Sequence, residues 1–392
     1  MTPYSLAAAE QHRDVFTTLP PELLTQIWDD DTLQLAPSAI AISKTHLLHA
    51  RRNAYRSLHI DSDITLAALG EQLGQTPYLG LLVDEIEIKE EAKSRSGLEA
   101  DFTGAASWLE ASFIKAFEGM PHVKKISITR CNPGELLSAR IMASAAFKSA
   151  TTLQLASGDN IDYSALRNLH LSPSLKTLDI KTPMRYQAGM PSGLFEPSMS
   201  GIEKLAMSAE PHSADFEAFF EHLRLRELDL RSGTTDAHRV FESLGDSTRQ
   251  NLRSLSFTST GYHERNVDAA LIGFHSLERL SIVSSQLSIT PTFFSTLQHL
   301  PLVSLVFHGP RNPLLGHVLD WLQSNEQPTT LKEIGVDVSV VRKSSLSGEV
   351  PMWSRWRKED DVSRLAAICA KTGVKLAGTI CDALLLIPRA AL

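Results

Sequence analysis

One short pattern recurs along almost the whole sequence. An apolar residue is followed three positions later by a second and two positions after that by a third, and eleven copies can be aligned, with Leu175/Leu178/Ile180 as a clear example. The middle residues of the copies are at positions 58, 86, 126, 153, 178, 205, 228, 255, 280, 305 and 334. Successive copies are separated by 23–29 residues, apart from one interval of 40, so the chain is an array of similar units.

The spacing of the three apolar positions predicts one strand per unit. The second and third residues are two apart, so they share one face of a strand, and the residue between them points to the other face. A period of about 20–29 residues with this register is the signature of a leucine-rich repeat. Because one unit cannot bury its apolar side alone, neighbours have to stack. We therefore predict an α/β leucine-rich-repeat solenoid over residues 57–392, with a curved parallel sheet whose inner face is a binding surface.

Segments between the strands are expected to form an outer helical layer. Helix start signals precede apolar periodic stretches at Ser213, Asp236, Thr290 and Asn312. The apolar residues of these stretches should pack against the strands as core. At the end of the array, a helix over residues 361–371, a stop at Gly373 and a last strand with Val374 and Leu376 are expected to form a cap.

The composition of the chain limits the partners, cofactors and cellular compartments that we expect. The net charge of -7 is modest for 392 residues and mixed in sign along the chain, so neither a nucleic acid nor a membrane surface is expected as partner. The three cysteines form no CxxC pair, which indicates neither a disulfide framework nor a zinc site, and no other cofactor is expected. There is no N-glycosylation sequon, no leader pattern and no long apolar window, so we expect a protein of the cytoplasm, the nucleus or both.

The sequence also offers no sign of catalysis. It contains no GxSxG, HExxH, GxGxxG or Walker motif. His46 and His49 are three apart on an expected helix, but no acidic or thiol partner lies nearby in the sequence, so they are interpreted as surface residues. We therefore expect a protein without enzymatic activity.

A separate head precedes the array, with residues 1–14 expected to be disordered and residues 15–56 expected to form short helices. Pro20 and Pro21 suit a first helical turn. The apolar residues that follow them, from Leu23 to Trp28, leave more apolar surface than a helix of this length can bury in so small a domain. This surface suggests contact with a partner.

The head resembles the F-box family. The LPxELLxxI opening of that motif is matched by Leu19, Pro20, Glu22, Leu23, Leu24 and Ile27. The resemblance is good over residues 15–28 and loose over 29–56, where the tryptophan-bearing helix usual in F-boxes has no counterpart. It implies a noncatalytic substrate receptor of a cullin-type ubiquitin ligase, which binds a Skp-type adaptor through these residues and Trp28 and selects an unknown target protein through the repeats.

Two other interpretations stay open. The head could be only an N-terminal cap that covers the first repeat, as solenoids require, and the chain would then be an interaction scaffold with no role in ubiquitination. The array could also wrap an enzyme and regulate it, as inhibitor-type horseshoes do.

Two groups of residues are predicted to contact the target. The inner sheet face should carry charged contacts over residues 175–310, from Asp179, Lys181, Asp229, Arg231, Arg279 and His308. A second strip is suggested near the end of the array, where Trp353 and Trp356 lie beside Arg355, Arg357 and Lys358. The simpler interpretation of this strip is that the tryptophans fasten the segment onto the last repeats.

Overall fold

The fold was obtained as a computed structural model. It describes residues 55–61, 63–89, 106–129, 136–156, 161–185, 201–209, 220, 223–231, 237–259, 271–284, 291–308, 313–324, 327–337 and 359–381. The expected disordered stretch 1–14 and the F-box-like region 15–56, apart from Tyr55 and Arg56, lie outside these residues, as do Trp353 and Trp356.

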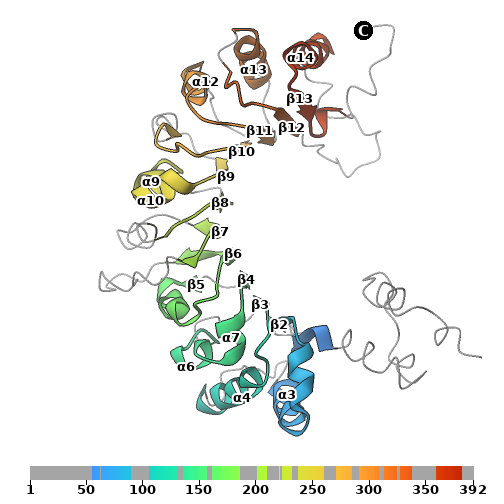
Figure 1. Cartoon of the computed structure of the whole chain (residues 1–392), viewed down its shortest axis with the longest axis vertical. Helices are drawn as coiled ribbons and strands as arrows, with labels where there is room; N and C mark the ends of the chain where they lie inside the picture. Colours follow the sequence, from blue (N-terminus) through green and yellow to red (C-terminus); the bar gives the residue numbers. More distant parts are fainter. Residues whose placement is uncertain are drawn as a thin grey trace, which may run out of the picture.

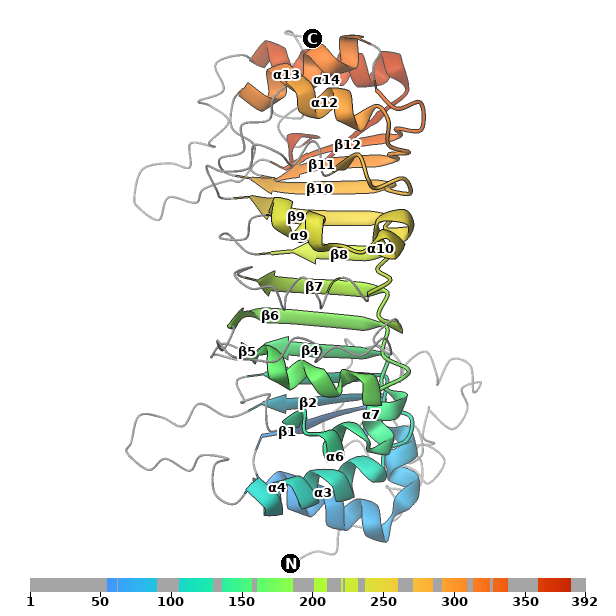
Figure 2. The same ribbon diagram turned by 90° about the vertical axis from the view of Figure 1, so that its left-hand side faces the viewer.

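A single parallel sheet runs through the molecule, and its strands follow the order of the sequence. Figure 2 shows the strands stacked as successive rungs that all point the same way. They are β1 (Ser57–Ile60), β2 (Glu85–Lys89), β3 (Lys125–Thr129), β4 (Thr152–Ala156), β6 (Thr177–Arg185), β7 (Lys204–Ala209), β8 (Glu227–Leu230), β9 (Ser254–Ser259), β10 (Arg279–Ser284), β11 (Ser304–His308), β12 (Glu333–Asp337) and β13 (Lys375–Ala377).

The register of the sheet confirms the predicted array. The middle apolar residue of each copy lies opposite the middle residue of the next, from Leu58 and Ile86 in β1 and β2 to Leu305 and Ile334 in β11 and β12. Each unit therefore adds one rung in constant register, even across the interval of 40 residues. This arrangement is the α/β leucine-rich-repeat solenoid predicted from the spacing.

Helices and irregular segments cover the outer side of the sheet, as Figure 1 shows. They include helices after three of the four expected start signals, over residues 237–243, 291–297 and 313–324, while the stretch after Ser213 lies almost wholly outside the described residues. The elements are α3 (Asp63–Gln75), η4 (Pro77–Leu82), α4 (Ala106–Glu118), α6 (Ala139–Met142), α7 (Ala145–Ser149), η5 (Tyr163–Leu171), α9 (Ala237–Ser243), α10 (Asp246–Asn251), α12 (Pro291–Leu297), α13 (Pro313–Ser324) and α14 (Glu359–Thr372).

The core lies between the strands and this outer layer. All the described second and third apolar residues from Ile60 to Val336 are buried. Aromatic residues of the return segments fill the space behind them: the ring of Phe241 meets those of Phe257 and Phe274 edge to face, with centroids 5.5 and 5.7 Å apart. The prediction that Phe220, Val240, Phe241, Phe293, Phe294, Leu297 and Trp321 belong to the core is confirmed.

The strand starts are joined by a backbone ladder. The carbonyl oxygen of Asp84 accepts hydrogen bonds from the N–H groups of Lys124 and Lys125, at 2.7 and 3.2 Å, and the carbonyl of Lys124 accepts from Thr151 and Thr152 in the same way. This double acceptance recurs from repeat to repeat as far as Val303. Hydroxyl groups add to it, since Thr151 Oγ1 donates to Lys124 O at 3.1 Å. The ladder satisfies backbone groups that would otherwise be left unpaired at each turn.

The array departs from its pattern in the middle and ends as expected. The apolar pattern predicts β6 only to Ile180, but the strand continues to Arg185 because the short strand β5 (Ile161–Asp162) pairs with its second half, after a register shift. At the other end, α14 stops at Gly373, whose φ is 74°, and β13 pairs with β12. The predicted helix, its stop at Gly373 and the last strand are thus confirmed.

Candidate functional site on the inner face of the sheet

The residue between the second and third apolar positions of each repeat faces away from the core. The strand register brings these residues into one row across the sheet, called here the middle column. Its members are His59, Glu87, Ser127, Gln154, Asp179, Ala206, Asp229, Ser256, Ser281, Val306 and Gly335. The row has three carboxylates in its first seven positions and small or apolar residues beyond them.

A three-residue ionic cluster lies at the centre of the middle column. Arg231, directly after β8, donates from Nε to Asp229 Oδ2 at 2.7 Å and from Nη1 to Asp179 Oδ1 at 3.0 Å. The second contact spans two strands, and Ala206 is the residue of β7 in between. Burial lowers the pKa of Arg231, but the carboxylates of Asp229 and Asp179 outweigh it, so the pKa is raised above its usual value. The sheet therefore fixes a permanent cation between two anions.

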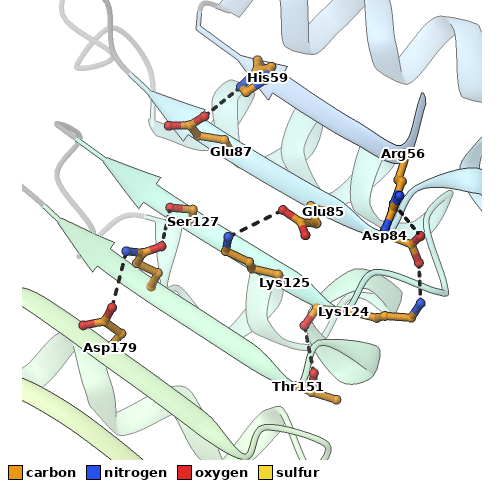
Figure 3. Close-up of polar contacts among 11 residues, drawn as sticks. Arg56, His59, Asp84, Glu85, Glu87, Lys124, Lys125, Ser127, Thr151 and Asp179 are labelled. Atoms are coloured by element: carbon orange, nitrogen blue, oxygen red, sulfur yellow. Dashed lines mark hydrogen bonds and ion pairs between the residues drawn. The ribbon is translucent and has the colours of Figure 1, made fainter. Parts of the chain in front are cut away.

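Polar contacts extend from this cluster towards the N-terminal repeats, as Figure 3 shows. Gln154 Nε2 donates to Asp179 Oδ2 at 3.4 Å, and Ser127 Oγ donates to Gln154 Oε1 at 3.5 Å. His59 Nδ1 lies 2.8 Å from Glu87 Oε2 on the neighbouring strand. The first half of the middle column therefore contains two linked groups, one of His59 with Glu87 and one of Ser127 and Gln154 with Asp179.

Lys181 and Arg279, two more of the predicted contacts, also point away from the core. Lys181 is exposed beside Asp179 on the same strand. Arg279 is exposed and its Nη2 lies 3.7 Å from Glu227 Oε1, two strands away. Both side chains keep donors available to a partner.

His308 joins the strands β10, β11 and β12. Its Nε2 lies 3.0 Å from Ser281 Oγ, and its Nδ1 lies 2.8 Å from Asp337 Oδ2. This order of contacts is that of a serine-hydrolase triad, which also needs donors for an oxyanion. The backbone N–H groups around Ser281 are used by the sheet, because β10 and β11 are paired on both sides. These three residues are better explained as contacts that fasten the end of the array to the sheet. Asp337 also binds the segment after β13, since the Thr379 N–H donates to Asp337 Oδ1 at 2.9 Å.

The strand starts carry a second charged row that the motif analysis missed. It consists of the two residues between the first and second apolar positions of each repeat, and we call it the strand-start rim. In the described repeats its charged members are Arg56, Asp84, Glu85, Lys124, Lys125, Lys176, Glu203, Lys204, Arg226, Glu227, Arg253, Glu278, Arg279, Lys332, Glu333 and Lys375. Aligning the repeats by their apolar triplets and adding the charges at these two positions would have revealed it.

The structure brings together Asp179, Asp229 and Arg231 and places Lys181, Arg279 and His308 on the same face. The predicted adaptor-binding residues from Leu19 to Trp28, and the pair Trp353 and Trp356, lie outside the described residues. Within the described ranges, no group of three or more metal-binding side chains is found. No helix among them has the length and apolar character needed to cross a membrane.

Comparisons with known proteins add the following. No family model matches the sequence. No curated protein matches it either. Among solved structures, a chain of the Toll–Spatzle complex of Drosophila is 15% identical with a TM-score of 0.41, over 65% of this chain and 31% of that one. A leucine-rich-repeat protein of Leptospira interrogans is 11% identical with a TM-score of 0.28, over 68% of this chain and 70% of that one. Since both TM-scores are low, the assignment to leucine-rich-repeat solenoids rests on the strand register and repeat spacing.

Proposed function

We propose that the chain is a noncatalytic protein-recognition subunit whose target binds the inner face of the sheet. The observation that carries the proposal is the constant register of the strands, which brings one outward-facing residue from each of eleven repeats into one continuous row, eight of them polar. An extended concave surface of this kind is what repeat solenoids use to bind proteins. The Arg231 cluster lies near the middle of this row and supplies fixed charges for specificity.

The chemistry of the middle column supports a protein target over a nucleic acid. Its charged residues are Glu87, Asp179 and Asp229, and none of its positions is lysine or arginine. Phosphate groups would be repelled there. A protein surface with mixed hydrogen-bonding groups fits the row of carboxylate, amide and hydroxyl groups better.

The finer proposal is a substrate receptor of a cullin-type ubiquitin ligase. It is supported by the F-box resemblance of Leu19, Pro20, Glu22, Leu23, Leu24 and Ile27, placed directly before a repeat array. In this role the head binds a Skp-type adaptor, the adaptor joins a cullin scaffold, and the inner face of the sheet holds the protein to be ubiquitinated. Trp28 extends the same apolar run of the sequence. Trp353 and Trp356 are proposed as a further target contact.

One experiment tests the adaptor step directly. The full chain is co-expressed with a Skp-type adaptor, and co-purification is compared with that of the Leu23→Ala, Leu24→Ala double variant. We expect the double variant to lose the adaptor and to keep the midpoint of thermal unfolding of the array. Failure of the unaltered chain to bind the adaptor would exclude the ligase role.

A scaffold without a ligase role, whose head is only an N-terminal cap of the array, is the second candidate; it needs a well-packed first repeat for the head to cover. Tyr55 packs against the core of the first repeats and its hydroxyl accepts a hydrogen bond from Gln72 Nε2 at 2.5 Å. Arg56 Nε lies 3.7 Å from Asp84. These contacts fix the start of the first repeat against the second, while residues 15–54, which would form the cap, lie outside the described residues. Unfolding of the first repeats by the Leu23→Ala, Leu24→Ala change would support this role.

A further inference from the structure

The strand-start rim differs in charge from the rest of the chain. Its 24 described positions, from Arg56 to Lys375, hold ten basic and six acidic side chains, which gives a net charge of +4 in a protein whose total is -7. The same positions hold no aromatic residue. The excess of positive charge therefore lies in one row along a single edge of the sheet.

Ion pairs order this row. Asp84 lies between Arg56 on β1's side and Lys124 on β3's side, with N–O distances of 3.7 and 2.7 Å, and Figure 3 shows the three side chains across the strand starts. Glu203 is flanked in the same way by Lys176 at 3.9 Å and Arg226 at 3.7 Å. Pairs also join Glu85 to Lys125, Glu227 to Lys204 and Arg279, Glu278 to Arg253, and Glu333 to Lys375.

The two signs of charge differ in their access to solvent. The side chains of the six carboxylates are 25–47% exposed, whereas those of the cations paired with them are 42–73% exposed. Lys332 is exposed and has no carboxylate within ion-pair distance among the described residues. In eight of the nine ion pairs the cation is more exposed than its carboxylate, and only in the Lys125–Glu85 pair is the order reversed, so ammonium and guanidinium groups make up most of the outer surface of the rim. Each of these groups has several N–H donors, so one ion pair leaves donors free.

We propose that the strand-start rim binds an acidic, extended segment of a protein partner. The proposal deepens the proposed function and rests on it, because it names the class of partner segment that the solenoid recognises. Neighbouring strands are about 4.8 Å apart, so the rim from Lys124 to Arg226 is roughly 19 Å long and matches about six residues of extended peptide. Carboxylates spaced along such a segment pair with the outer cations.

The ion pairs favour a peptide over a nucleic acid. A phosphate backbone presents a dense and regular row of negative charge, and Asp84, Glu203 and the other rim carboxylates would repel it every few strands. Single-stranded nucleic acids also bind through aromatic side chains, and the described rim positions have none. An acidic peptide can place its carboxylates opposite cations and neutral side chains opposite the rim's own acids.

The test uses the full chain and a fluorescein-labelled peptide of about twelve residues in which glutamate alternates with serine. Fluorescence anisotropy measures its affinity for the unaltered protein, and we expect binding that weakens about tenfold between roughly 50 and 300 mM NaCl. The rim variant carries Lys124→Gln, Lys176→Gln and Arg226→Gln and should bind about tenfold more weakly. The matched control carries Lys115→Gln, Lys148→Gln and Lys371→Gln, three exposed lysines of α4, α7 and α14, and should keep its affinity.

Three outcomes would overturn the proposal. They are no binding of the glutamate peptide, equal weakening by the rim and helix variants, or tighter binding of a single-stranded oligonucleotide than of the peptide. If the rim variant unfolds, Lys176→Gln alone serves instead, because Lys176 lies within the stretch proposed to bind the peptide, is 63% exposed and makes only a 3.9 Å contact with Glu203, and it should weaken peptide binding about twofold. The peptide measurements do not depend on adaptor co-purification or on target binding at Asp179 and Asp229. A failure of the rim proposal can therefore be told apart from a failure of the proposed function.

Discussion

Arg231 and Asp179 are 52 residues apart in sequence, yet their side chains are joined by a 3.0 Å hydrogen bond that passes over a whole strand. The contact is made because Ala206 is the residue between them, and its methyl group leaves room for the guanidinium. The cluster therefore ties three repeats together on the solvent side of the sheet, whereas the core ties them on the other side.

The first prediction concerns the energy of this contact. Arg231→Gln and Asp179→Asn should each destabilise the array slightly, and their double-mutant cycle should give a coupling of about 0.5 kcal/mol, because the arginine side chain is 39% exposed and solvent screens the pair. Urea unfolding measures it. Ala206→Leu should remove the coupling by displacing the guanidinium. A coupling unchanged in the Ala206→Leu background would contradict the geometry.

The second prediction concerns a buried hydroxyl in α10. Thr248 Oγ1 donates to Leu223 O at 2.6 Å and accepts from the Leu225 N–H at 3.2 Å, and the residue is fully buried. Thr248→Val keeps the shape but leaves both backbone groups without a partner, so it should lower the free energy of unfolding by about 1–3 kcal/mol. Thr248→Ser, which keeps the hydroxyl, should cost clearly less. Equal losses in the two variants would show that packing, rather than hydrogen bonding, fixes this turn.

The third prediction separates two glycines of the C-terminal cap. Both have positive φ, but a Cβ on Gly373 would meet no atom within 4 Å, whereas one on Gly378 would lie 2.6 Å from Val336 O. Gly373→Ala should therefore cost only the backbone strain of about 1 kcal/mol. Gly378→Ala should in addition push β13 away from β12, which hydrogen exchange would report as faster exchange of the amides of residues 375–377. Similar exchange in the two variants would refute this assignment.

The fourth prediction concerns the pH dependence of Cys369. Burial, followed by the nearby Cys381 thiol, raises the pKa of the Cys369 thiol. The folded state thus keeps the proton to a higher pH than the unfolded state, so the contribution to stability is complete below the unfolded pKa of about 8.5 and is lost as pH rises above it. Urea unfolding between about pH 7.5 and 10 should show a steeper fall for the natural chain than for Cys369→Val. Cys381→Ser serves as the control and should keep most of the slope.

The strands could be predicted almost completely from the sequence. Each apolar triplet became a strand in the expected register, because burying a continuous apolar row on one face leaves no other alignment. The last strand around Leu376 and the stop at Gly373 were also predicted correctly. β5 was not, since Ile161 and Asp162 are too few to show an alternating pattern.

From the sequence, the candidate site could be predicted only as rows of aligned residues across the repeats, without the contacts among their side chains. Aligning the repeats placed Asp179 and Asp229 in one row and Arg231 in the next, which is confirmed. The alignment could not tell that Arg231 would bond both carboxylates, because that depends on rotamers and on the free space above Ala206. The charge of the strand-start rim could have been read from the sequence, but its significance depends on the greater exposure of most rim cations than of their paired carboxylates, which only the structure reveals.

The doubly accepting carbonyls at the strand starts have an evolutionary consequence. They hold each turn through main-chain atoms, so this ladder does not depend on which side chains stand at Lys124, Lys125 and their counterparts. Charges in these positions can be exchanged, added or reversed at little thermodynamic cost. A new recognition preference can therefore arise along this edge while the solenoid beneath it stays the same.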